Sequence, residues 1–392
     1  MSLPELRLKS HEERRLRAGH LWVYSNEVDI VKTPLAGVAP GTLCRLVDSR
    51  NKPLGLAYVN PHTLLAARLL TSKADAVIDG AWFARRIQSA RVLRERLYAQ
   101  PYYRLVYGES DGLPGLVIDR YGEVCVVQIA TAGMEKFKLD IVEGLKHTLA
   151  PAGILFRNDV GMRETEGLPS SIEEVGDVPD TVTIEEAGVR FEIPIKTGQK
   201  TGWFYDQRSN RDALARYAPG KAVLDVFSYL GGWSLRALKA GATSALAIDS
   251  SAAALEGAAR NAALNGLQLE TIKGQALDTL RELRTQPRKF DVVVVDPPAL
   301  IKRKKDLETG SAHYAALNKT AIELLAPEGI LVSCSCSHHL DADALQRILL
   351  RESRSAGRRL QILEQGAQGP DHPVHPAIPE TRYLKAFFCR VV

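Results

Sequence analysis

The chain has 392 residues, of which 45% are hydrophobic and 25% are charged, and its formal net charge is +5. These values are typical of soluble globular proteins, and the length predicts two or three domains. No stretch approaches the roughly 20 apolar residues of a membrane span, and the N-terminus lacks the apolar segment of a signal peptide. Five cysteines, an odd number in a long chain, favour a reducing compartment over a disulfide framework, so we expect a cytoplasmic protein without a membrane partner.

The first 70 residues are predicted to form a small β-rich module, because strand-like runs at 43–49, 53–60 and 64–70 follow one another closely. A short basic helix and a further strand precede these runs. This region combines basic and aromatic side chains in a way that suits RNA contact: Arg14, Arg15, Arg17, His20 and Trp22. A solvated helical face beside a core tryptophan explains the same residues, and we favour it on these residues alone.

A helix is predicted over residues 76–98, with Phe83, Ile87, Ala90 and Leu97 on its apolar side. Arginines cover much of the remaining surface: Arg85, Arg86, Arg91, Arg94 and Arg96. Such a face could follow a phosphate backbone, but it is more often only solvated.

Residues 100–185 are predicted to form an α+β unit. Strands separated by tight turns occupy residues 106–130, a helix follows over about 135–149, and a polar, acid-rich stretch runs to Glu186. Cys125 lies in an apolar run and is predicted to belong to the core. No catalytic group of residues is visible in this unit.

A strand at 189–195 leads into a loop with three consecutive aromatic residues, Trp203, Phe204 and Tyr205. A helix is predicted to begin near Asp206, which would act as its N-cap or first-turn acid. The loop lies just upstream of the motif described next and is a candidate lid for it.

Residues 221–251 organise the C-terminal half, because they read as strand, glycine turn, helix and second strand. The first strand, Val223–Val226, includes Asp225, and the second, Ala245–Ile248, ends on Asp249. Such a unit binds a nucleoside-containing cofactor at the carboxyl end of a parallel sheet, with the acid on the ribose hydroxyls. An ordinary α/β crossover with acids at its strand ends is the alternative for this stretch alone.

The turn reads Asp-x-Phe-x-x-x-Gly-Gly and offers no cradle for a pyrophosphate. S-adenosylmethionine is therefore the predicted cofactor, with Asp225 facing its cationic methionine end and Asp249 its ribose. The two turns and the next strand tip, which commonly meets the adenine, add further candidate contacts: Phe227, Ser228, Ser250, Gln275, Ala276 and Asp278.

The apolar, β-branched run at 290–300 is predicted to be a parallel strand buried on both faces, and it ends in Asp296-Pro297-Pro298. The prolines stiffen the turn and remove backbone donors, so that this edge can accept a flat ring. The strand that follows ends in two cysteines and two histidines: Cys334, Cys336, His338 and His339.

A carboxylate beside a thiol suggests methylation at carbon-5 of a pyrimidine. A cysteine thiolate adds to carbon-6, which makes carbon-5 nucleophilic, and Asp296 would assist at the ring nitrogen as general acid or hydrogen-bond partner. We favour Cys336 as the nucleophile, because it lies just beyond the strand tip, whereas Cys334 is one pleat deeper. A zinc site is the weaker interpretation, since no second ligand pair with zinc-site spacing is present.

The C-terminal tail contains a loop rich in proline and histidine, which could cover the active site, and then a strand from Tyr383. His372 and His375 in this loop are polar candidates, although isolated loop histidines are more often solvated. Cys389 lies in the last strand and is predicted to be buried.

Five segments together resemble the bacterial ribosomal RNA large-subunit methyltransferase I family over essentially the whole chain: DVFSYLGGWSLRALKAGA, VVVVDPPAL, SCSCSHHL, GESDGLPGLVIDRYG and DHPVHPAIPETRYLK. The resemblance implies 5-methylcytosine formation in large-subunit ribosomal RNA with S-adenosylmethionine, and it suggests a homodimer. It also implies an α/β fold with three parts: a PUA-like RNA-binding β-barrel (1–72), a central α+β domain (73–187) and a Rossmann-like class I methyltransferase domain (188–392).

Carried over by residue, the resemblance places Asp225, Tyr229 and Gly231 at the methionine end of the cofactor and Asp249 at its ribose. It places Asp296 at the target base and makes Cys336 the nucleophile. Other RNA 5-methylcytosine enzymes carry a cysteine after the Pro-Pro pair that helps product release, and this chain has Ala299 there. Cys334, His338 or a water is then the candidate base.

Two other methylation chemistries and one non-catalytic role compete with this interpretation. Methylation of an exocyclic amino group needs no cysteine, but it usually places an aromatic residue where Ala299 stands. Uracil remains open as the target, since cysteine addition serves both pyrimidines. A non-catalytic RNA-binding protein is disfavoured by the intact Asp225, Asp249 and Asp296.

Overall fold

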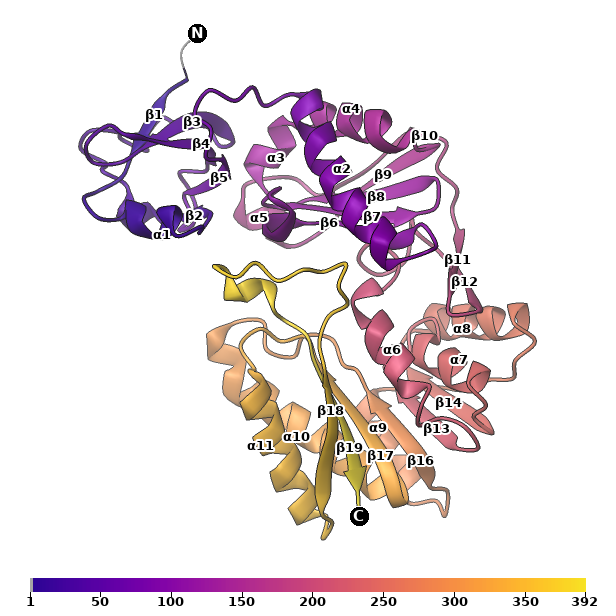
Figure 1. Ribbon diagram of the computed structural model, residues 1–392. Helices are drawn as coiled ribbons and strands as arrows, with labels where there is room; N and C mark the ends of the chain where they lie inside the picture. Colours follow the sequence, from indigo (N-terminus) through magenta and orange to yellow (C-terminus); the bar gives the residue numbers. More distant parts are fainter. Residues whose placement is uncertain (1–2) are drawn as a thin grey trace. The chain divides into compact units, whose positions relative to one another are not determined.

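Residues 3–392 are described by a computed structural model (Figure 1). They divide into two compact units, each made of three segments. Unit 1 contains the chain up to Val182, Pro194–Trp203 and Pro370–Thr381, and unit 2 contains Thr183–Ile193, Phe204–Gly369 and Arg382–Val392. Within the described residues, no helix combines the length and the apolar character needed to cross a membrane.

The N-terminal part of unit 1 is a five-stranded sheet with the order β1-β3-β4-β5-β2. Its elements are β1 (Glu5–Arg7), α1 (Glu13–Arg17), β2 (Trp22–Val23), β3 (Thr42–Val47), β4 (Pro53–Val59) and β5 (Ala67–Thr71). β1 pairs with β3 in parallel, while β3, β4 and β5 pair antiparallel. Leu46, Val59 and Leu69 contribute to one buried core, so the β-rich module predicted for this region is confirmed.

The rest of unit 1 contains a second five-stranded sheet, with the order β10-β9-β8-β7-β6. Its strands are β6 (Tyr102–Tyr107), β7 (Leu116–Tyr121), β8 (Val124–Ile129), β9 (Gly153–Asn158) and β10 (Ser171–Gly176). Its helices are α2 (Gly80–Leu97), α3 (Ala132–Lys136), α4 (Lys138–Leu149) and α5 (Met162–Thr165). α2 and α4 lie side by side over this sheet (Figure 1), and their apolar residues share a core with the strands.

The helix predicted at 76–98 differs from α2 in its start and in its buried face. It begins at Gly80, because the Asp79 side chain caps it by accepting a hydrogen bond from the backbone N of Trp82 at 2.8 Å. Leu97 is 43% exposed, whereas Arg94 is fully buried and donates to both carboxylate oxygens of Asp111. The periodicity predicted that Leu97 packs on the buried side of this helix, whereas the structure has the Arg94–Asp111 ion pair buried there and leaves Leu97 partly exposed.

Two further predictions for unit 1 were wrong in detail. The helix expected over 135–149 is split into α3 and α4 at Phe137. The acid-rich stretch before Glu186 contains β10, which pairs antiparallel with β9. Its residues Glu173 and Glu174 are exposed on this edge strand, so the alternation of apolar and polar residues that marks a strand is missing.

Unit 2 is built on a seven-stranded sheet with the order β15-β14-β13-β16-β17-β19-β18. Its strands are β13 (Ala222–Val226), β14 (Ser244–Asp249), β15 (Glu270–Lys273), β16 (Phe290–Val295), β17 (Leu325–Ser335), β18 (Leu360–Gly366) and β19 (Lys385–Val391). β13 to β17 are parallel, and β19 runs antiparallel to both β17 and β18. β18 was not predicted, because most of its residues are polar or partly exposed.

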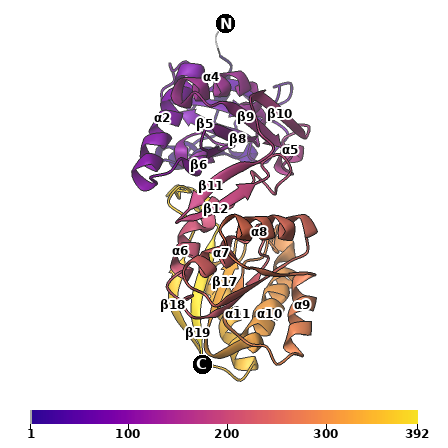
Figure 2. The ribbon, with the colours of Figure 1, turned by 90° about the vertical axis from the view of Figure 1, so that its right-hand side faces the viewer.

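Helices cover both faces of this sheet (Figure 1; Figure 2). They are α6 (Arg208–Leu214), α7 (Gly232–Lys239), α8 (Ala252–Leu264), α9 (Ala276–Arg284), α10 (Leu307–Leu324) and α11 (Ala342–Ser355). One buried cluster joins α6 and α7 to one face, and another joins α9, α10 and α11 to the opposite face. The predicted α/β, Rossmann-like class of this part is confirmed.

Smaller elements complete the chain. β11 (Val182–Glu186) and β12 (Val189–Ile193) form a two-stranded sheet. Short 3-10 helices are η1 (Ser25–Glu27), η2 (Gly108–Asp111), η3 (Tyr205–Gln207), η4 (Lys304–Asp306) and η5 (Pro379–Thr381).

The strand order of unit 2 reverses between β13 and β16, since the chain first extends the sheet through β14 and β15 and then returns to the other side of β13. In open α/β sheets, ligands bind at such a switch point, outside the carboxyl ends of the strands. Asp225, near the end of β13, and Asp296, directly after β16, both belong to this edge.

Candidate cofactor and catalytic site

Asp225 is fully buried near the carboxyl end of β13. Its Oδ2 accepts hydrogen bonds from the backbone N (3.0 Å) and Oγ (2.7 Å) of Ser234 in α7. Its Oδ1 and the buried Oγ of Ser228 have no hydrogen-bond partner among the described residues. Buried polar atoms are almost always paired, so these two oxygens indicate a place for polar groups of a ligand.

Burial raises the pKa of Asp225 to about 7; the hydrogen bonds from Ser234 oppose this, and the charges of Asp296 and Asp249 add to it. A cationic ligand would offset this unfavourable charge. The site therefore suits a positively charged group such as the methionine end of S-adenosylmethionine.

The turn after β13 has an unusual backbone. Phe227, Tyr229 and Gly231 have φ values of 67°, 49° and 80°, and left-handed residues other than glycine cost roughly 1–3 kcal/mol each. The end of β14 holds this turn, because the backbone N atoms of Phe227 and Ser228 donate to O of Ile248 at 2.9 and 3.0 Å. Backbone strain of this kind clusters at ligand-binding turns, and here it lies at the predicted cofactor turn.

Asp249 joins the strand tips. Its Oδ2 accepts from the backbone N of Tyr229 and its Oδ1 from that of Ser251, both at 2.9 Å. The Asp249 carbonyl accepts from the backbone N of Gly274 at 3.0 Å. The next residue, Gln275, stands at the N-cap position of α9 with no side-chain capping bond.

The candidate cofactor residues of three strands thus lie along one edge of the sheet, including Ala276, the first residue of α9, and the exposed Ser250. Ser250 does not cap the helix that follows it, α8. Ser251 is the cap, and its Oγ accepts from the backbone N of Ala254 at 3.2 Å.

Asp296 follows β16 and is held by two neutral donors. Gln207 Nε2 donates to its Oδ1 at 2.8 Å, and Trp233 Nε1 donates to its Oδ2 at 3.0 Å. Desolvation raises the pKa of Asp296 to about 6, against the hydrogen bond from Trp233, and the charge of Asp206 raises it further. The carboxyl group is fixed in orientation and titrates near neutrality, so it can give a proton or a hydrogen bond to a ring nitrogen.

The two candidate cysteines at the end of β17 differ in access. Cys334 is fully buried, and burial raises the pKa of its thiol well above the usual value. Cys336 is partly accessible, and its Sγ lies 3.9 Å from O of Pro297, in the turn that follows Asp296. The remaining cysteines of the chain are buried, so Cys336 is the one thiol that a base could reach.

Hydroxyl groups fasten the turn that carries Cys336. Ser335 Oγ donates to Tyr314 OH at 2.9 Å, and Tyr314 OH lies 3.0 Å from Ser337 Oγ. Ser337 Oγ also accepts from the backbone N of Ile301 at 3.1 Å, beyond the Asp-Pro-Pro turn. The residues on both sides of Cys336 are thereby tied to α10.

Several functional candidates are not visible in the sequence: Gln207, Trp233, Tyr314 and Lys385. In the sequence, Trp233 is only one apolar position of a predicted helix. The residues that flank Gln207 in the sequence give no sign that the Gln207 side chain reaches Asp296. The aromatic loop was a partial signal, since Phe204 contacts Tyr229 edge to face at a ring distance of 5.5 Å.

Other polar candidates belong to unit 1 and have local partners. His372 is buried, and its Nδ1 lies 2.9 Å from Oδ1 of Asp371. Arg15 and Arg17, both in α1, form ion pairs with Glu27 and Asp48. His372 is therefore paired with a carboxylate of the tail itself. Of the basic residues considered for RNA contact, Arg15 and Arg17 are paired with carboxylates.

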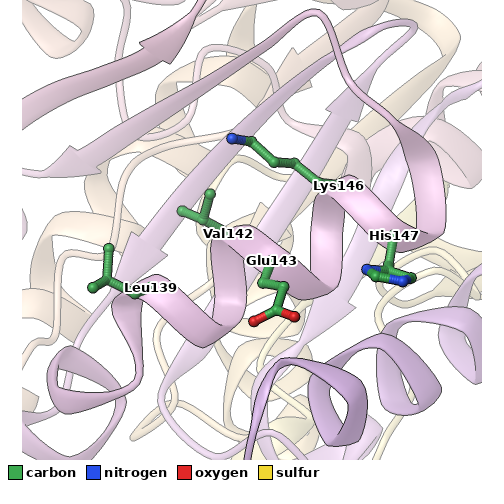
Figure 3. Close-up of a pocket in the computed structure, with 5 residues that line it drawn as sticks. All are labelled: Leu139, Val142, Glu143, Lys146 and His147. Atoms are coloured by element: carbon green, nitrogen blue, oxygen red, sulfur yellow. The ribbon is translucent and has the colours of Figure 1, made fainter.

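Two surface hollows lie in unit 1. The first, about 610 Å³, follows one side of α4 from Leu139 to His147 and contains no candidate residue (Figure 3). The charged residues that line the second, about 370 Å³, are Lys73, Asp75, Arg85 and Arg86. Within residues 3–392, no group of three or more histidine, cysteine or acidic side chains could hold a metal ion.

Comparison with known proteins identifies two domains. Residues 157–390 match the model of an S-adenosylmethionine-dependent methyltransferase family, and residues 6–72 match a PUA-like domain. The chain resembles the crystal structure of SMU.776 complexed with SAH at a TM-score of 0.84 and 20% identity, with 99% of this chain and 100% of that chain covered. A SAM-dependent methyltransferase from Streptococcus mutans gives 0.82 at 20% identity, with the same coverage. These structures confirm the predicted fold.

Curated relatives match over the full length. Ribosomal RNA large subunit methyltransferase I of Cronobacter sakazakii is 38% identical over 400 residues, with 100% of both chains covered. The enzyme of the same name from Yersinia pestis is 37% identical, with 98% of both chains covered. The orphaned oxygens of Asp225 and Ser228 also fit the cationic cofactor of such enzymes. The chain therefore belongs to the ribosomal RNA large subunit methyltransferase I family, and its cofactor is S-adenosylmethionine.

Proposed function

We propose that the protein methylates carbon-5 of a cytosine in large-subunit ribosomal RNA through a covalent adduct between Cys336 and the base. The observation that carries this proposal is the accessible thiol of Cys336, 3.9 Å from O of Pro297, the residue that follows Asp296, whose carboxyl group is fixed by Gln207 and Trp233. The names of the curated relatives support the RNA substrate.

Carbon-5 of cytosine is a poor nucleophile until a group adds at carbon-6. The Cys336 thiolate gives its electron pair to a new S–C6 bond, which raises the electron density at carbon-5. Asp296 meets ring nitrogen 3 and stabilises the adduct by a hydrogen bond or a proton. S-adenosylmethionine supplies the methyl group that carbon-5 gains. When a base takes the carbon-5 proton, the C6–S bond breaks and its electron pair returns to the sulfur of Cys336.

The cofactor would occupy the edge formed by the ends of β13, β14 and β15. Asp225 offers its buried Oδ1 to the methionine end, together with Ser228, and Asp249 offers its carboxylate to the ribose. Gln275 and Ala276 stand at the tip proposed for the adenine. The strained turn from Phe227 to Gly231 would fit closely against the bound molecule.

Two groups of basic side chains support contact with RNA. Lys302–Lys305 are four consecutive exposed basic residues that begin four residues after Pro298, and among the described residues only Arg303 of this group forms an ion pair. The second group lines the hollow of unit 1: Lys73, Arg85 and Arg86, the last of which stacks over Trp82. Within residues 3–392 these three side chains form no ion pair. Unpaired basic side chains are available to bind phosphates.

We also propose how the chain divides into domains. Residues 1–72 would be the PUA-like RNA-binding domain, 73–187 the central α+β domain and 188–392 the methyltransferase domain. The match of residues 6–72 to a PUA-like domain supports the first of these.

Trapping with large-subunit RNA that contains 5-fluorocytidine tests the proposal. Fluorine at carbon-5 blocks the final elimination, so the wild-type enzyme should form a denaturation-resistant complex when cofactor is present. Cys336→Ala should form none, and the matched control Cys334→Ala should still form it, because Cys334 is fully buried. Loss of the complex only in Cys334→Ala would move the nucleophile one pleat deeper.

Nucleoside analysis of methylated RNA completes the test. The expected product is 5-methylcytidine. A methylated RNA without any trapped complex would overturn the covalent mechanism and support amino-group methylation, and 5-methyluridine would overturn cytosine as the target.

A further inference from the structure

Lys385 is a buried lysine beside the turn that carries Cys336. It opens β19 and pairs in register with Ser335, the residue before Cys336. Its ammonium donates to O of Ser337, the residue after Cys336, at 2.7 Å, and to O of Tyr383 at 2.8 Å. The cation is thus fixed to the backbone immediately next to the accessible thiol.

The Lys385 ammonium has no carboxylate partner. The residue is 8% exposed, and within residues 3–392 no acidic side chain forms an ion pair with it. Burial lowers the pKa of Lys385 to about 8, while the charges of Cys336 and Asp341 oppose this. A buried charge without a partner costs several kcal/mol, so a negative group close to Lys385 would be strongly favoured.

Of the two negative groups that act on Lys385, Asp341 is exposed and caps α11 by accepting from the backbone N of Ala344 at 2.7 Å, which leaves Cys336 as the buried-side partner. The ionisable groups around Cys336 are few. They come from separate elements packed at this edge: Cys334 (β17), Tyr314 (α10), Asp296 (after β16), Asp341 (the cap of α11) and Lys385 (β19). Lys385 is the cation of this group. Arg211 is another cation near Asp296, but it donates to both carboxylate oxygens of Glu186, at 2.6 and 2.7 Å.

We propose that the Lys385 ammonium is the counter-charge that keeps Cys336 in its thiolate form. Lys385 is then a positioning residue that acts through Cys336, and the inference rests on the proposed function. The interaction is reciprocal: if a negative Cys336 stabilises the ammonium, the ammonium stabilises the negative sulfur by the same free energy.

The same contact would assist both covalent steps. Before addition, the ammonium raises the fraction of Cys336 that is present as the reactive thiolate. When the sulfur then gives its electron pair to carbon-6, negative charge moves from the sulfur into the ring. When the base has taken the carbon-5 proton and the C6–S bond breaks, the electron pair returns to sulfur beside the ammonium. A stabilised thiolate is a better leaving group, which bears on product release in a chain that has Ala299 where related RNA enzymes carry a second cysteine.

Alkylation of the native protein measures the thiolate directly, without RNA or cofactor. Only Cys336 is accessible among the cysteines, so the rate of its modification by iodoacetamide can be followed by peptide mass spectrometry as a function of pH. Lys385→Met should slow alkylation at neutral pH by on the order of tenfold, since a nearby opposite charge shifts an ionisation by about 1–3 pH units. The rates should converge at high pH.

Matched variants separate charge from structure. Lys385→Arg should retain part of the fast alkylation, and Lys239→Met, which removes an exposed ammonium at the end of α7, should behave as wild type. In methylation assays, Lys385→Met should lower kcat at neutral pH, and kcat should return toward the wild-type value at higher pH. The KM for RNA should change little. Identical alkylation profiles for wild type and folded Lys385→Met would overturn the proposal.

If Lys385→Met does not fold, a second measurement that leaves Lys385 in place still tests the proposal. Ultraviolet absorbance of the thiolate, taken as the difference between wild type and Cys336→Ala during a pH titration, should show ionisation well below that of an ordinary thiol. A midpoint at or above the ordinary value would overturn the proposal.

The outcomes for the proposed function are distinct. If Cys336 is a thiolate but 5-fluorocytidine RNA is not trapped, the covalent mechanism fails and the charge pair stands. If Lys385→Met alkylates normally and accumulates a stable adduct with unmodified RNA, Lys385 is the base that takes the carbon-5 proton, and its role as counter-charge is overturned.

Discussion

Buried charged side chains have ion-pair partners in unit 1, whereas a buried carboxylate at the sheet edge of unit 2 has none among the described residues. In unit 1, Arg94 donates to both oxygens of Asp111 at 2.6 and 2.7 Å, and Arg104 does the same to Asp119 at 2.9 and 2.8 Å. In unit 2, the buried Asp225 has only Ser234 on one oxygen and nothing on the other within the described residues.

The contrast separates groups that hold the fold from groups that await a ligand. Paired charges fix the fold, and breaking one leaves the partner buried and uncompensated. Unpaired charges at the sheet edge make the unliganded protein less stable than it could be, and strained residues such as Tyr229 add to that cost. Cofactor and substrate would supply the missing partners, which is how proteins commonly exchange stability for function.

Breaking the Arg94–Asp111 pair should have the largest effect on stability. Arg94→Met should lower the free energy of unfolding by about 3–5 kcal/mol, because it leaves a buried carboxylate without its partner. The matched control is Arg96→Met on the exposed side of the same helix, which should change stability by less than about 0.5 kcal/mol. Urea unfolding measures both, and equal midpoints for the two variants would show that the buried pair adds nothing.

Removing the charge of Asp225 should act in the opposite direction. Asp225→Asn should raise the free energy of unfolding of the unliganded protein at pH 8 by on the order of 1–4 kcal/mol, since the wild type must carry an unfavourable buried charge there. It should also weaken S-adenosylmethionine binding at least about tenfold, because it removes the buried charge that we propose to face the cofactor. Thermal unfolding and calorimetry measure the two effects. A destabilised variant that binds the cofactor normally would contradict the assignment of Asp225.

How far these sites were visible in the sequence depends on the range of the interaction. The position of Asp225, Asp249 and Asp296 at one edge of the sheet was predicted correctly, because each stands at the end of an apolar run and parallel strands bring their carboxyl ends to one edge. Local patterns also predicted the βαβ unit at 221–251 correctly. Periodicity alone placed Leu97 in the core, and the structure places Arg94 there.

The residues that were missed act across long sequence separations. Gln207 reaches Asp296 over 89 residues, and Lys385 reaches Ser337 over 48. No local spacing encodes such interactions, because they are set by how η3 and β19 lie against the sheet. β10 was missed for a different reason, since its exposed glutamates hide the alternation that marks a strand.

The pH dependence of Asp225 follows from the sign of its shift. Its pKa is raised from the ordinary range to about 7 in the folded protein, so the folded state binds more protons than the unfolded state between these values. Its contribution to stability is complete at low pH and is lost as the pH rises through about 7. Wild type minus Asp225→Asn should therefore give a stability difference that falls as pH increases, and a flat difference would contradict the shift.

Cofactor binding should show the reverse trend. S-adenosylmethionine carries a positive sulfonium, so its affinity should increase as Asp225 ionises, and the demethylated product, which lacks that charge, should respond less. The ratio of the two dissociation constants across the pH range isolates the sulfonium interaction, and Asp225→Asn should make this ratio independent of pH. A wild-type ratio that does not vary would place the sulfonium away from Asp225 and leave the α-ammonium, which both molecules carry, as the group that Asp225 meets.

The smallest expected effects concern RNA binding by exposed cations, where the two units can be compared directly. Replacing Lys302, Lys304 and Lys305 with glutamine should reduce the slope of log K against log salt by about 0.7 for each single-strand phosphate that the protein no longer binds. The same change at Lys73, Arg85 and Arg86 tests the hollow in unit 1. A control triple at Lys221, Lys239 and Lys289, which are exposed at the opposite edge of the unit 2 sheet, removes equal charge and should leave the slope unchanged. If the slope falls equally in all three variants, RNA affinity depends only on the net charge of the protein. Neither the Lys302–Lys305 group nor the hollow in unit 1 is then a specific phosphate-binding site.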